Sequence, residues 1–378
     1  MSAGGGAVRH LYVHLPFCAS RCGYCDFVTV VGRGVQHRAY VSALLAELSL
    51  EGEVLAPGLE SVFLGGGTPT FTAPGELRRL LRALPPAEEV TVESNPETVT
   101  PAVAALLRES GVTRVSLGAQ SFQPRLLSVL ERRSSPDDVR RAVYALRDVG
   151  FDNISLDLIY GIPGQSPADL DADLSEALAL EPEHLSCYEL EAKRGTRFTH
   201  AHGAELARQA EAMESYFERV VARVTAAGYR WYETANFCRR PQLADGRDLR
   251  SRHNLAYWQS RDYLGIGIGA VSTIHGRRWR TKPGLGPYLA ALAAGKSPPR
   301  EVEELSVPVR RSERVLLGLR LDEPLALGAG LDRAVDWSAV ERLERLGLVR
   351  SGGPASDTLA LTKRGRFLGG GVTAELLA

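Results

Sequence analysis

The chain has 378 residues, of which 44% are hydrophobic and 24% are charged, and its 45 Lys and Arg residues balance 45 Asp and Glu residues. This composition is ordinary for a globular protein, and the balanced charge excludes a global attraction to nucleic acid or to an anionic membrane. No apolar run approaches the roughly 20 residues of a membrane-spanning helix, and the first ten residues lack the apolar segment of a secretory signal. We therefore expect a cytoplasmic protein without nucleic-acid partners.

The first 240 residues alternate short apolar runs with amphipathic ones. Strands are predicted at residues 11–15, 61–64, 90–93, 112–117, 154–159 and 184–190, with a closing or edge strand at 229–233. Helices are predicted between them, at residues 36–50, 77–84, 135–150 and 205–227 and directly after Thr100-Pro101 and Ser166-Pro167. Alternating strands and helices indicate an α/β fold with a parallel sheet. We expect a partial (β/α)6 TIM-like barrel over residues 1–240, with its chemistry at the carboxyl ends of the strands.

Two segments follow the predicted barrel. Residues 241–300 are expected to form a connecting segment that ends at Pro298-Pro299, where a boundary is plausible. Residues 301–378 are expected to form a small, mainly α-helical C-terminal domain. Its predicted helices at 313–321 and 335–346 precede a strand-like stretch at 359–362, an order that favours a winged-helix-like fold.

Three of the five cysteines lie within one short stretch, Cys18-x3-Cys22-x2-Cys25, directly after the first predicted strand. This spacing is too tight for a disulfide framework, and it favours a metal centre in a reducing compartment. One interpretation is a structural zinc site with His14 as the fourth ligand. The interpretation that the spacing favours is a [4Fe–4S] cluster, in which three irons bind thiolates and one iron stays open to another ligand.

The segment 12–27 resembles the radical S-adenosylmethionine (SAM) superfamily through its cysteine spacing and through Tyr12, Pro16-Phe17 and Tyr24 around it. It is most similar to the branch that contains oxygen-independent coproporphyrinogen III oxidases and HemW-type heme chaperones. The resemblance covers most of the chain. It implies a [4Fe–4S] cluster on the three cysteines, SAM bound at the open iron, and an electron donor that reduces the cluster.

The resemblance also implies a set of cofactor-binding residues near the strand ends: Tyr12, Tyr24, Gly66, Gly67, Thr68, Glu93, Gln120, Arg132, Asp157 and Ile159. The glycines allow the backbone to approach a ligand closely. A carboxylate suits ribose hydroxyls, and an arginine suits the SAM carboxylate. Each polar residue taken alone could equally be a salt-bridged rim residue, and Ile159 could be a core residue. The family often has Gly and His where this chain has Glu131 and Ser134, which leaves the geometry around Arg132 open.

Two features of the sequence bear on whether the chain resembles the oxidases or the heme chaperones. The cysteine pattern of the oxidases resembles Cys-x3-Cys-x2-Cys-x-Cys, and this chain has Phe27 in place of the fourth cysteine. The stretch His253-Asn254-x2-Tyr257-Trp258 resembles the HNxxYW signature of the heme chaperones. That signature implies His253 as a ligand of heme iron, whereas an isolated histidine would more often be a hydrogen-bonded loop residue.

The leading hypothesis is a heme chaperone that binds heme and transfers it to acceptor hemoproteins such as respiratory cytochromes. The alternative is a radical SAM enzyme, the oxygen-independent coproporphyrinogen III oxidase, which decarboxylates coproporphyrinogen III to protoporphyrinogen IX. A zinc-bound binding module is a third hypothesis. Peripheral membrane contact and a homodimer stay open on this sequence.

Overall fold

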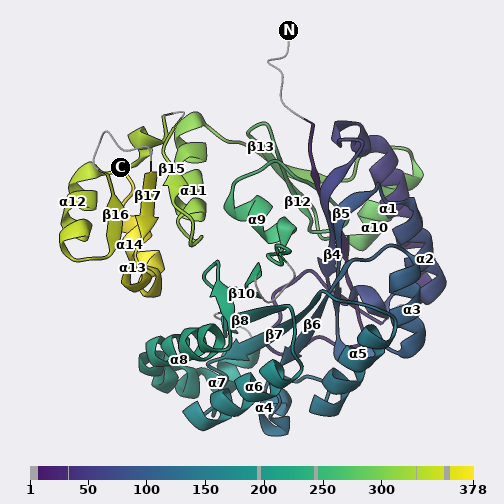
Figure 1. Ribbon diagram of the computed structural model, residues 1–378. Helices are drawn as coiled ribbons and strands as arrows, with labels where there is room; N and C mark the ends of the chain where they lie inside the picture. Colours follow the sequence, from purple (N-terminus) through teal and green to yellow (C-terminus); the bar gives the residue numbers. More distant parts are fainter. Residues whose placement is uncertain (1–6, 33, 194–196, 242–245, 329, 353–357) are drawn as a thin grey trace.

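The computed structural model describes residues 7–32, 34–193, 197–241, 246–328, 330–352 and 358–378 (Figure 1). Within these residues the largest sheet runs in the order β11-β1-β4-β5-β6-β7-β8-β10-β9. The bounds of its strands are β1 (His10–Leu15), β4 (Leu59–Gly66), β5 (Ala87–Ser94), β6 (Arg114–Gln120), β7 (Ile154–Tyr160), β8 (His184–Glu189), β9 (Tyr229–Trp231), β10 (Asn236–Arg239) and β11 (Leu264–Ile266). Strands β1 and β4 to β8 are parallel, as the alternating pattern predicts.

Helices cover the outer face of this curved sheet (Figure 1). They are α1 (His37–Glu51), α2 (Pro74–Ala83), α3 (Pro101–Glu109), α4 (Pro124–Val129), α5 (Pro136–Asp148), α6 (Pro167–Ala179), α7 (Arg197–Gln209) and α8 (Met213–Ala226). The largest apolar cluster lies between the two layers, where strand residues such as Leu64, Val92 and Leu156 are fully buried. The α/β partial barrel is thus the observed architecture.

The capping signals predicted before three helices are confirmed. Ser135 and Ser166 each form a capping box with the aspartate three residues on, and the Thr100 hydroxyl accepts from the backbone N–H of Val103. These contacts satisfy N–H groups that a helix start leaves without partners. They therefore fix where each helix begins.

The prediction of one helix over residues 205–227 is wrong. The structure has two helices, α7 and α8, joined by a short 3-10 turn at Ala210–Ala212. Local preference does not reveal this break, because residues 205–212 are mostly strong helix formers. The break coincides with a tertiary contact. The Gln209 amide at the end of α7 donates to the carbonyls of Ile162 and Gln165 in the loop after β7.

The segment after residue 240 adds to the barrel sheet. It contains α9 (Arg252–Trp258), β11, α10 (Leu285–Ala293) and a second sheet of β12 (Val271–Ile274), β13 (Arg277–Thr281) and β14 (Arg300–Glu304). Strand β11 pairs in parallel with β1. The main sheet therefore extends past residue 240, because hydrogen bonding to β1 continues the parallel ladder.

The C-terminal part has an apolar core of its own, at the left of Figure 1. It comprises α11 (Val307–Gly318), β15 (Leu325–Ala326), α12 (Trp337–Arg345), β16 (Val349–Ser351), β17 (Thr358–Leu361), α13 (Lys363–Phe367) and α14 (Gly369–Glu375). Strands β16 and β17 pair antiparallel after α12, which is the order of a winged-helix arrangement.

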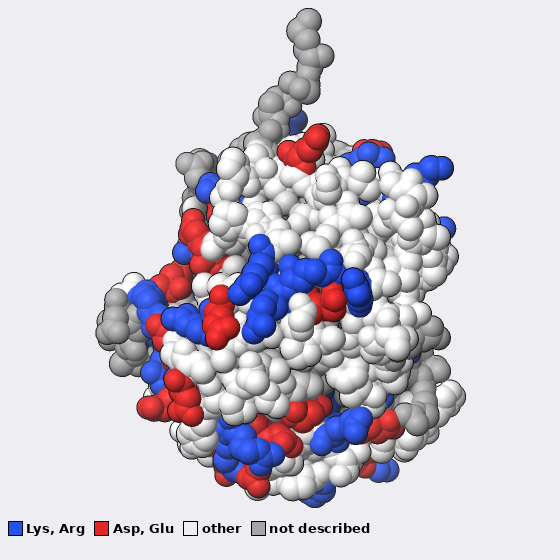
Figure 2. All heavy atoms as spheres, turned by 90° about the vertical axis from the view of Figure 1, so that its right-hand side faces the viewer, with Lys and Arg blue, Asp and Glu red and all other residues white. Residues whose placement is uncertain are grey.

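The outer face of the molecule is charged but mixed. Figure 2 shows basic side chains in a band across the side that carries α1 to α3 in Figure 1, with acidic side chains beside them. Arg79 of α2 pairs with Glu76, and Arg78 pairs with Glu109 of α3. Among the helices that the structure describes, none has the length and apolar character to cross a membrane.

Candidate functional site

The three clustered cysteines lie on a loop and at its base, where two short strands close it. Strand β2 (Phe17–Cys18) pairs in parallel with β3 (Val30–Val31), so residues 19–29 are held between two short strands. All three thiols are free; Cys18 is buried, while Cys22 and Cys25 are partly exposed. Cys18 thus lies in a short strand and not in the loop expected from the sequence, because the backbone of Val30 and Gly32 pairs with Pro16 and Cys18.

A chain of polar contacts connects Cys18 to Cys22 through two neighbouring strand ends. The Thr68 hydroxyl lies 3.6 Å from the Cys18 Sγ, and the Asn95 side-chain amide donates to Thr68 at 3.0 Å. Arg132 donates to the Asn95 Oδ1 at 2.9 Å, and its other terminal nitrogen lies 3.6 Å from the Cys22 Sγ. The structure therefore brings the predicted residues Thr68 and Arg132 together with the cysteines.

Asn95 is a member of this network that the sequence did not single out. It directly follows β5, in Ser94-Asn95-Pro96. Its place at a strand end is a signal that could have identified it, since polar residues at that edge of a barrel carry the chemistry. Its function here is to bridge a hydroxyl and a guanidinium that come from different loops.

The glycine-rich turn after β4 needs glycine for two reasons. Gly66 has φ +110°, and a Cβ at this position would lie 2.4 Å from the His14 ring. At Gly67, a Cβ would lie 2.6 Å from the Pro16 carbonyl. The bare backbone lets the turn pack against the cysteine loop, and it leaves the Gly66 N–H free to donate to Glu93 at 3.1 Å.

Two carboxylates lie near this turn on the inner side of the sheet. Burial raises the pKa of Glu93 to about 7; Asp157 raises it further, whereas the Gly66 N–H lowers it. Burial also raises the pKa of Asp157, against hydrogen bonds from the Ser186 and Ser116 hydroxyls. Two partly buried acids with raised pKa values are poorly solvated groups that a polar ligand could satisfy.

Gln120 is the last residue of β6, and its backbone is strained. Its φ is +65°, which is uncommon for a residue other than glycine, and the β6–β7 pairing shifts register between Gly118 and Gln120. Such a bulge redirects a side chain at the end of a strand. The Arg132 guanidinium donates to the Gly118 carbonyl at 2.8 Å, so Arg132 and Gln120 lie at the same bulge.

Tyr24 and Ile159 belong to an apolar cluster next to the site. Ile159 packs there with buried residues of α4 and of the loop after β7, and Tyr24 packs against them from the cysteine loop. Tyr12 lies outside this apolar cluster, next to Phe63 and His14. Its ring centroid is 6.2 Å from that of Phe63, and its hydroxyl lies 3.1 Å from the His14 Nδ1.

Both ring nitrogens of His14 are engaged, since Nε2 also lies 2.8 Å from the Val28 carbonyl oxygen. A zinc site would need a fourth ligand and four donors around one ion. Among the residues that the structure describes, no three His, Cys, Asp or Glu side chains converge to hold one metal ion.

The HNxxYW stretch forms the short helix α9 against the inner side of β1 and β4. His253 is 1% exposed, and its ring nitrogens lie 3.0 Å from the Ser61 hydroxyl and 2.9 Å from the Tyr257 hydroxyl. Its ring also stacks on Phe63 and Tyr12. Burial lowers the pKa of His253 to about 3, and His10 lowers it further. In this structure His253 is a neutral, hydrogen-bonded interior residue.

Phe27 and the HNxxYW stretch, which bear on the choice between oxidase and heme chaperone, lie beside the same cavity. A cavity of about 210 Å³ is lined by Phe27 and Tyr257 together with Tyr12, His14 and Arg280. Phe27 is 66% exposed, which is unusual for a large apolar side chain. The position of the missing fourth cysteine and the signature tyrosine therefore face the same space, although they are 230 residues apart.

Comparison with known proteins identifies the family of the chain. A model of the radical SAM superfamily matches residues 12–177. The chain is 38% identical to a heme chaperone HemW of Mycobacterium tuberculosis, over 97% of this chain and 94% of that protein. It is 31% identical to a heme chaperone HemW of Bacillus subtilis, over 98% and 99% of the two chains.

The solved structure of coproporphyrinogen III oxidase (HemN) from Escherichia coli superposes with a TM-score of 0.80. The superposition covers 98% of this chain and 90% of the HemN chain. At 22% identity, it shows that the two proteins share a fold. The superfamily match, the near full-length similarity and the shared fold agree, and the chain belongs to the HemW family of the radical SAM superfamily.

Proposed function

We propose that this protein is a heme chaperone that binds heme and transfers it to acceptor hemoproteins such as respiratory cytochromes. The observation that carries the proposal is its similarity, over nearly the whole chain, to relatives named as heme chaperones. The presence of Phe27 in place of a fourth cysteine, beside Tyr257 of the HNxxYW stretch, supports the same function.

The chaperone would carry a [4Fe–4S] cluster on Cys18, Cys22 and Cys25, together with SAM. The donor set fits, because three free thiols lie within eight residues, one at the base of the loop and two on it, with Thr68 and Arg132 beside two of them. When bound, the cluster supplies an electron for the cleavage of SAM, and an electron donor must replace that electron. Glu93, Gln120, Arg132 and Asp157 would bind SAM through its polar groups, while Tyr12, Tyr24 and Ile159 would supply apolar surface.

The assignment of His253 as an iron ligand stays a prediction. Iron binding at Nε2 would first have to displace the Tyr257 hydroxyl, and binding at Nδ1 would have to displace Ser61. The variant His253→Ala tests this assignment, with exposed His200→Ala as the matched control. If the Soret band of bound heme is the same in both variants, His253 is not a ligand.

The decisive experiment compares chaperone with oxidase in one preparation. The anaerobically reconstituted protein is titrated with hemin, offered an apo-cytochrome as acceptor, and assayed in parallel for coproporphyrinogen III turnover with SAM and a reductant. We expect stoichiometric heme binding, transfer to the acceptor and no protoporphyrinogen. Turnover without heme transfer would replace the chaperone proposal with the enzyme.

A variant with all three cluster cysteines changed to serine should lose its bound iron.

A further inference from the structure

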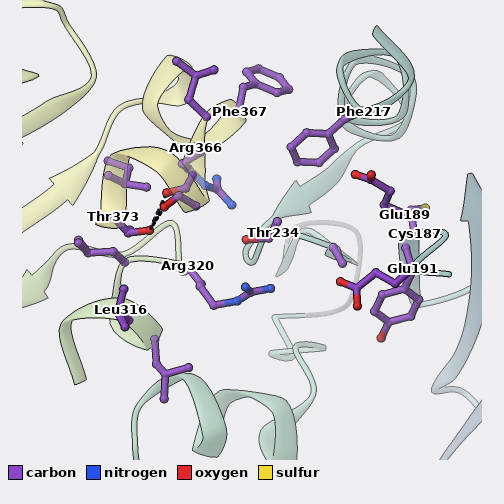
Figure 3. A pocket seen from close by; sticks show the side chains of 18 of the residues that line it. Cys187, Glu189, Glu191, Phe217, Thr234, Leu316, Arg320, Arg366, Phe367 and Thr373 are labelled. Carbon is purple, nitrogen blue, oxygen red and sulfur yellow. Dashed lines mark hydrogen bonds between the residues drawn. The ribbon is translucent and has the colours of Figure 1, made fainter. Parts of the chain in front are cut away.

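A second and larger cavity lies between the barrel and the C-terminal part. Its volume is about 630 Å³, within the roughly 300–1,000 Å³ of known small-molecule sites. One wall comes from the end of β8 and from α8, and the other from α11, α13 and α14 (Figure 3). None of the cofactor-binding residues predicted from the sequence lines this interdomain cavity.

The upper wall of the interdomain cavity is aromatic and apolar. Phe217 of α8 and Phe367 of α13 meet edge to face with ring centroids 5.4 Å apart, and Figure 3 shows both rings at the same end of the cavity. Leu316 and neighbouring leucines of α11 line another side. Surfaces of this kind favour a flat, largely apolar ligand.

Two arginines of the C-terminal part face the interdomain cavity, and each is stacked on a tryptophan. The Arg320 guanidinium lies 4.3 Å from the ring centroid of Trp258, and the Arg366 guanidinium lies 3.6 Å from that of Trp231. Trp258 is the last residue of the HNxxYW stretch. Stacking holds a guanidinium in one orientation, so the signature tryptophan supports one wall of this cavity.

Arg366 has a free hydrogen-bonding edge. One terminal nitrogen, Nη1, donates to the Trp231 carbonyl at 2.9 Å. The other two, Nε and Nη2, are buried and have no hydrogen-bond partner among the described residues. These two N–H groups form the edge that binds a carboxylate with two parallel hydrogen bonds. The nearby carboxylates are engaged elsewhere, since Asp322 pairs with Arg230 and Glu233 pairs with Arg320.

The opposite wall sets the orientation of an anionic ligand. Glu189 and Glu191 lie across the cavity from the two arginines, next to Cys187 (Figure 3). A ligand with carboxylates at one edge is attracted to the arginine wall and repelled from the glutamates. Tyrosine is one of the residue types that bind heme iron, and Tyr188 lines the far wall.

From this arrangement we propose that the interdomain cavity is the binding site of the heme cargo, with Arg366 binding a propionate. The inference rests on the proposed chaperone function and adds the place and orientation of the heme. It assigns to Trp258 the positioning of Arg320, and it leaves His253 as an interior residue.

Two matched pairs of variants test the cavity. A Cβ would meet nothing within 4 Å at Gly370, which lines the cavity, or at Gly371, its neighbour in α14, which does not. Gly370→Phe should fill the cavity and weaken hemin binding at least tenfold, while Gly371→Phe binds as the wild type does. Arg366→Gln should weaken binding about tenfold to a hundredfold, the effect of a lost charged hydrogen bond. Arg364→Gln, exposed on the same helix, should leave it unchanged.

The readout is the Soret titration of each variant, after circular dichroism has shown that it folds. Hemin dimethyl ester, which has no free carboxylates, is titrated in the same mixed solvent, and Arg366→Gln should bind it as well as the wild type does. Equal hemin affinity in all four variants would show that heme does not bind in the interdomain cavity. The proposed chaperone function would be unaffected by that result. A wild-type protein that binds no hemin would instead overturn the proposed function.

Discussion

Single residues at the cysteine site are constrained by their contacts as much as by their chemistry. Gly66 is the sharpest case, because its φ is +110° and a side chain would overlap a buried histidine that is held by two hydrogen bonds. A positive φ alone costs a residue with a side chain about 1–3 kcal/mol. The requirement for glycine here therefore follows from packing against the cysteine loop, independently of any ligand.

Gly66→Ala should accordingly lower the free energy of unfolding by about 2 kcal/mol or more. Chemical denaturation measures this change. Gly75→Ala in α2 is the control, because a Cβ there has open space and no positive φ, and alanine favours a helix by up to about 1 kcal/mol. Equal stability of the two variants would show that the His14 ring can move aside.

At the scale of elements, short local signals decide where helices begin. Ser166 accepts from the Asp169 N–H, and the Asp169 carboxylate accepts from the Ser166 N–H at 2.7 Å. The same aspartate pairs with Arg125 of α4. This local motif therefore links the start of α6 to α4, the helix that follows β6.

Ser166→Ala removes one half of this capping box and should cost about 1 kcal/mol in the free energy of unfolding. Ser128→Ala is the matched control, because the Ser128 hydroxyl bonds back to the Pro124 carbonyl inside α4 and its loss should stay within about 0.5 kcal/mol. Thermal or chemical unfolding of both variants gives the comparison. A loss no larger at Ser166 than at Ser128 would mean that tertiary packing alone places α6.

For the whole molecule, buried histidines and buried carboxylates oppose each other in their response to pH. Burial lowers the pKa of His10 to about 4 and of His253 to about 3, so below about pH 6.5 the unfolded chain binds protons that the folded chain does not. These histidines make the protein less stable as the pH falls. Glu93, with a pKa of about 7, does the reverse, because between about pH 7 and 4.5 the folded chain is the one that binds the proton.

Glu93→Gln should therefore make the free energy of unfolding fall more steeply between pH 7 and pH 5 than it does in the wild type. The difference is up to about 1.4 kcal/mol per pH unit for one group. Denaturation curves at pH 5, 6 and 7 measure it, with Glu88→Gln, exposed on the same strand, expected to follow the wild type. Parallel curves for Glu93→Gln and the wild type would contradict the linkage.

Local sequence patterns were sufficient to predict the features that depend on neighbouring residues. Hydrophobic periodicity indicated the six parallel strands, and Ser-Pro and Thr-Pro pairs indicated the helix starts, because these signals act over a few residues. The cysteine spacing and the resemblance around it indicated the family and the place of the cluster. The same local character explains the error at residues 205–227, where a tertiary contact of Gln209 accompanies a break that helix preference does not reveal.

The tertiary structure alone decided which distant residues meet. It placed Asn95 between Thr68 and Arg132, brought Phe27 to the same cavity as Tyr257, and buried both nitrogens of His253 in hydrogen bonds. It also left one edge of Arg366 unpaired beside a large cavity. None of these pairings leaves a local pattern, because each joins residues that lie far apart in the sequence and meet only when the elements pack together.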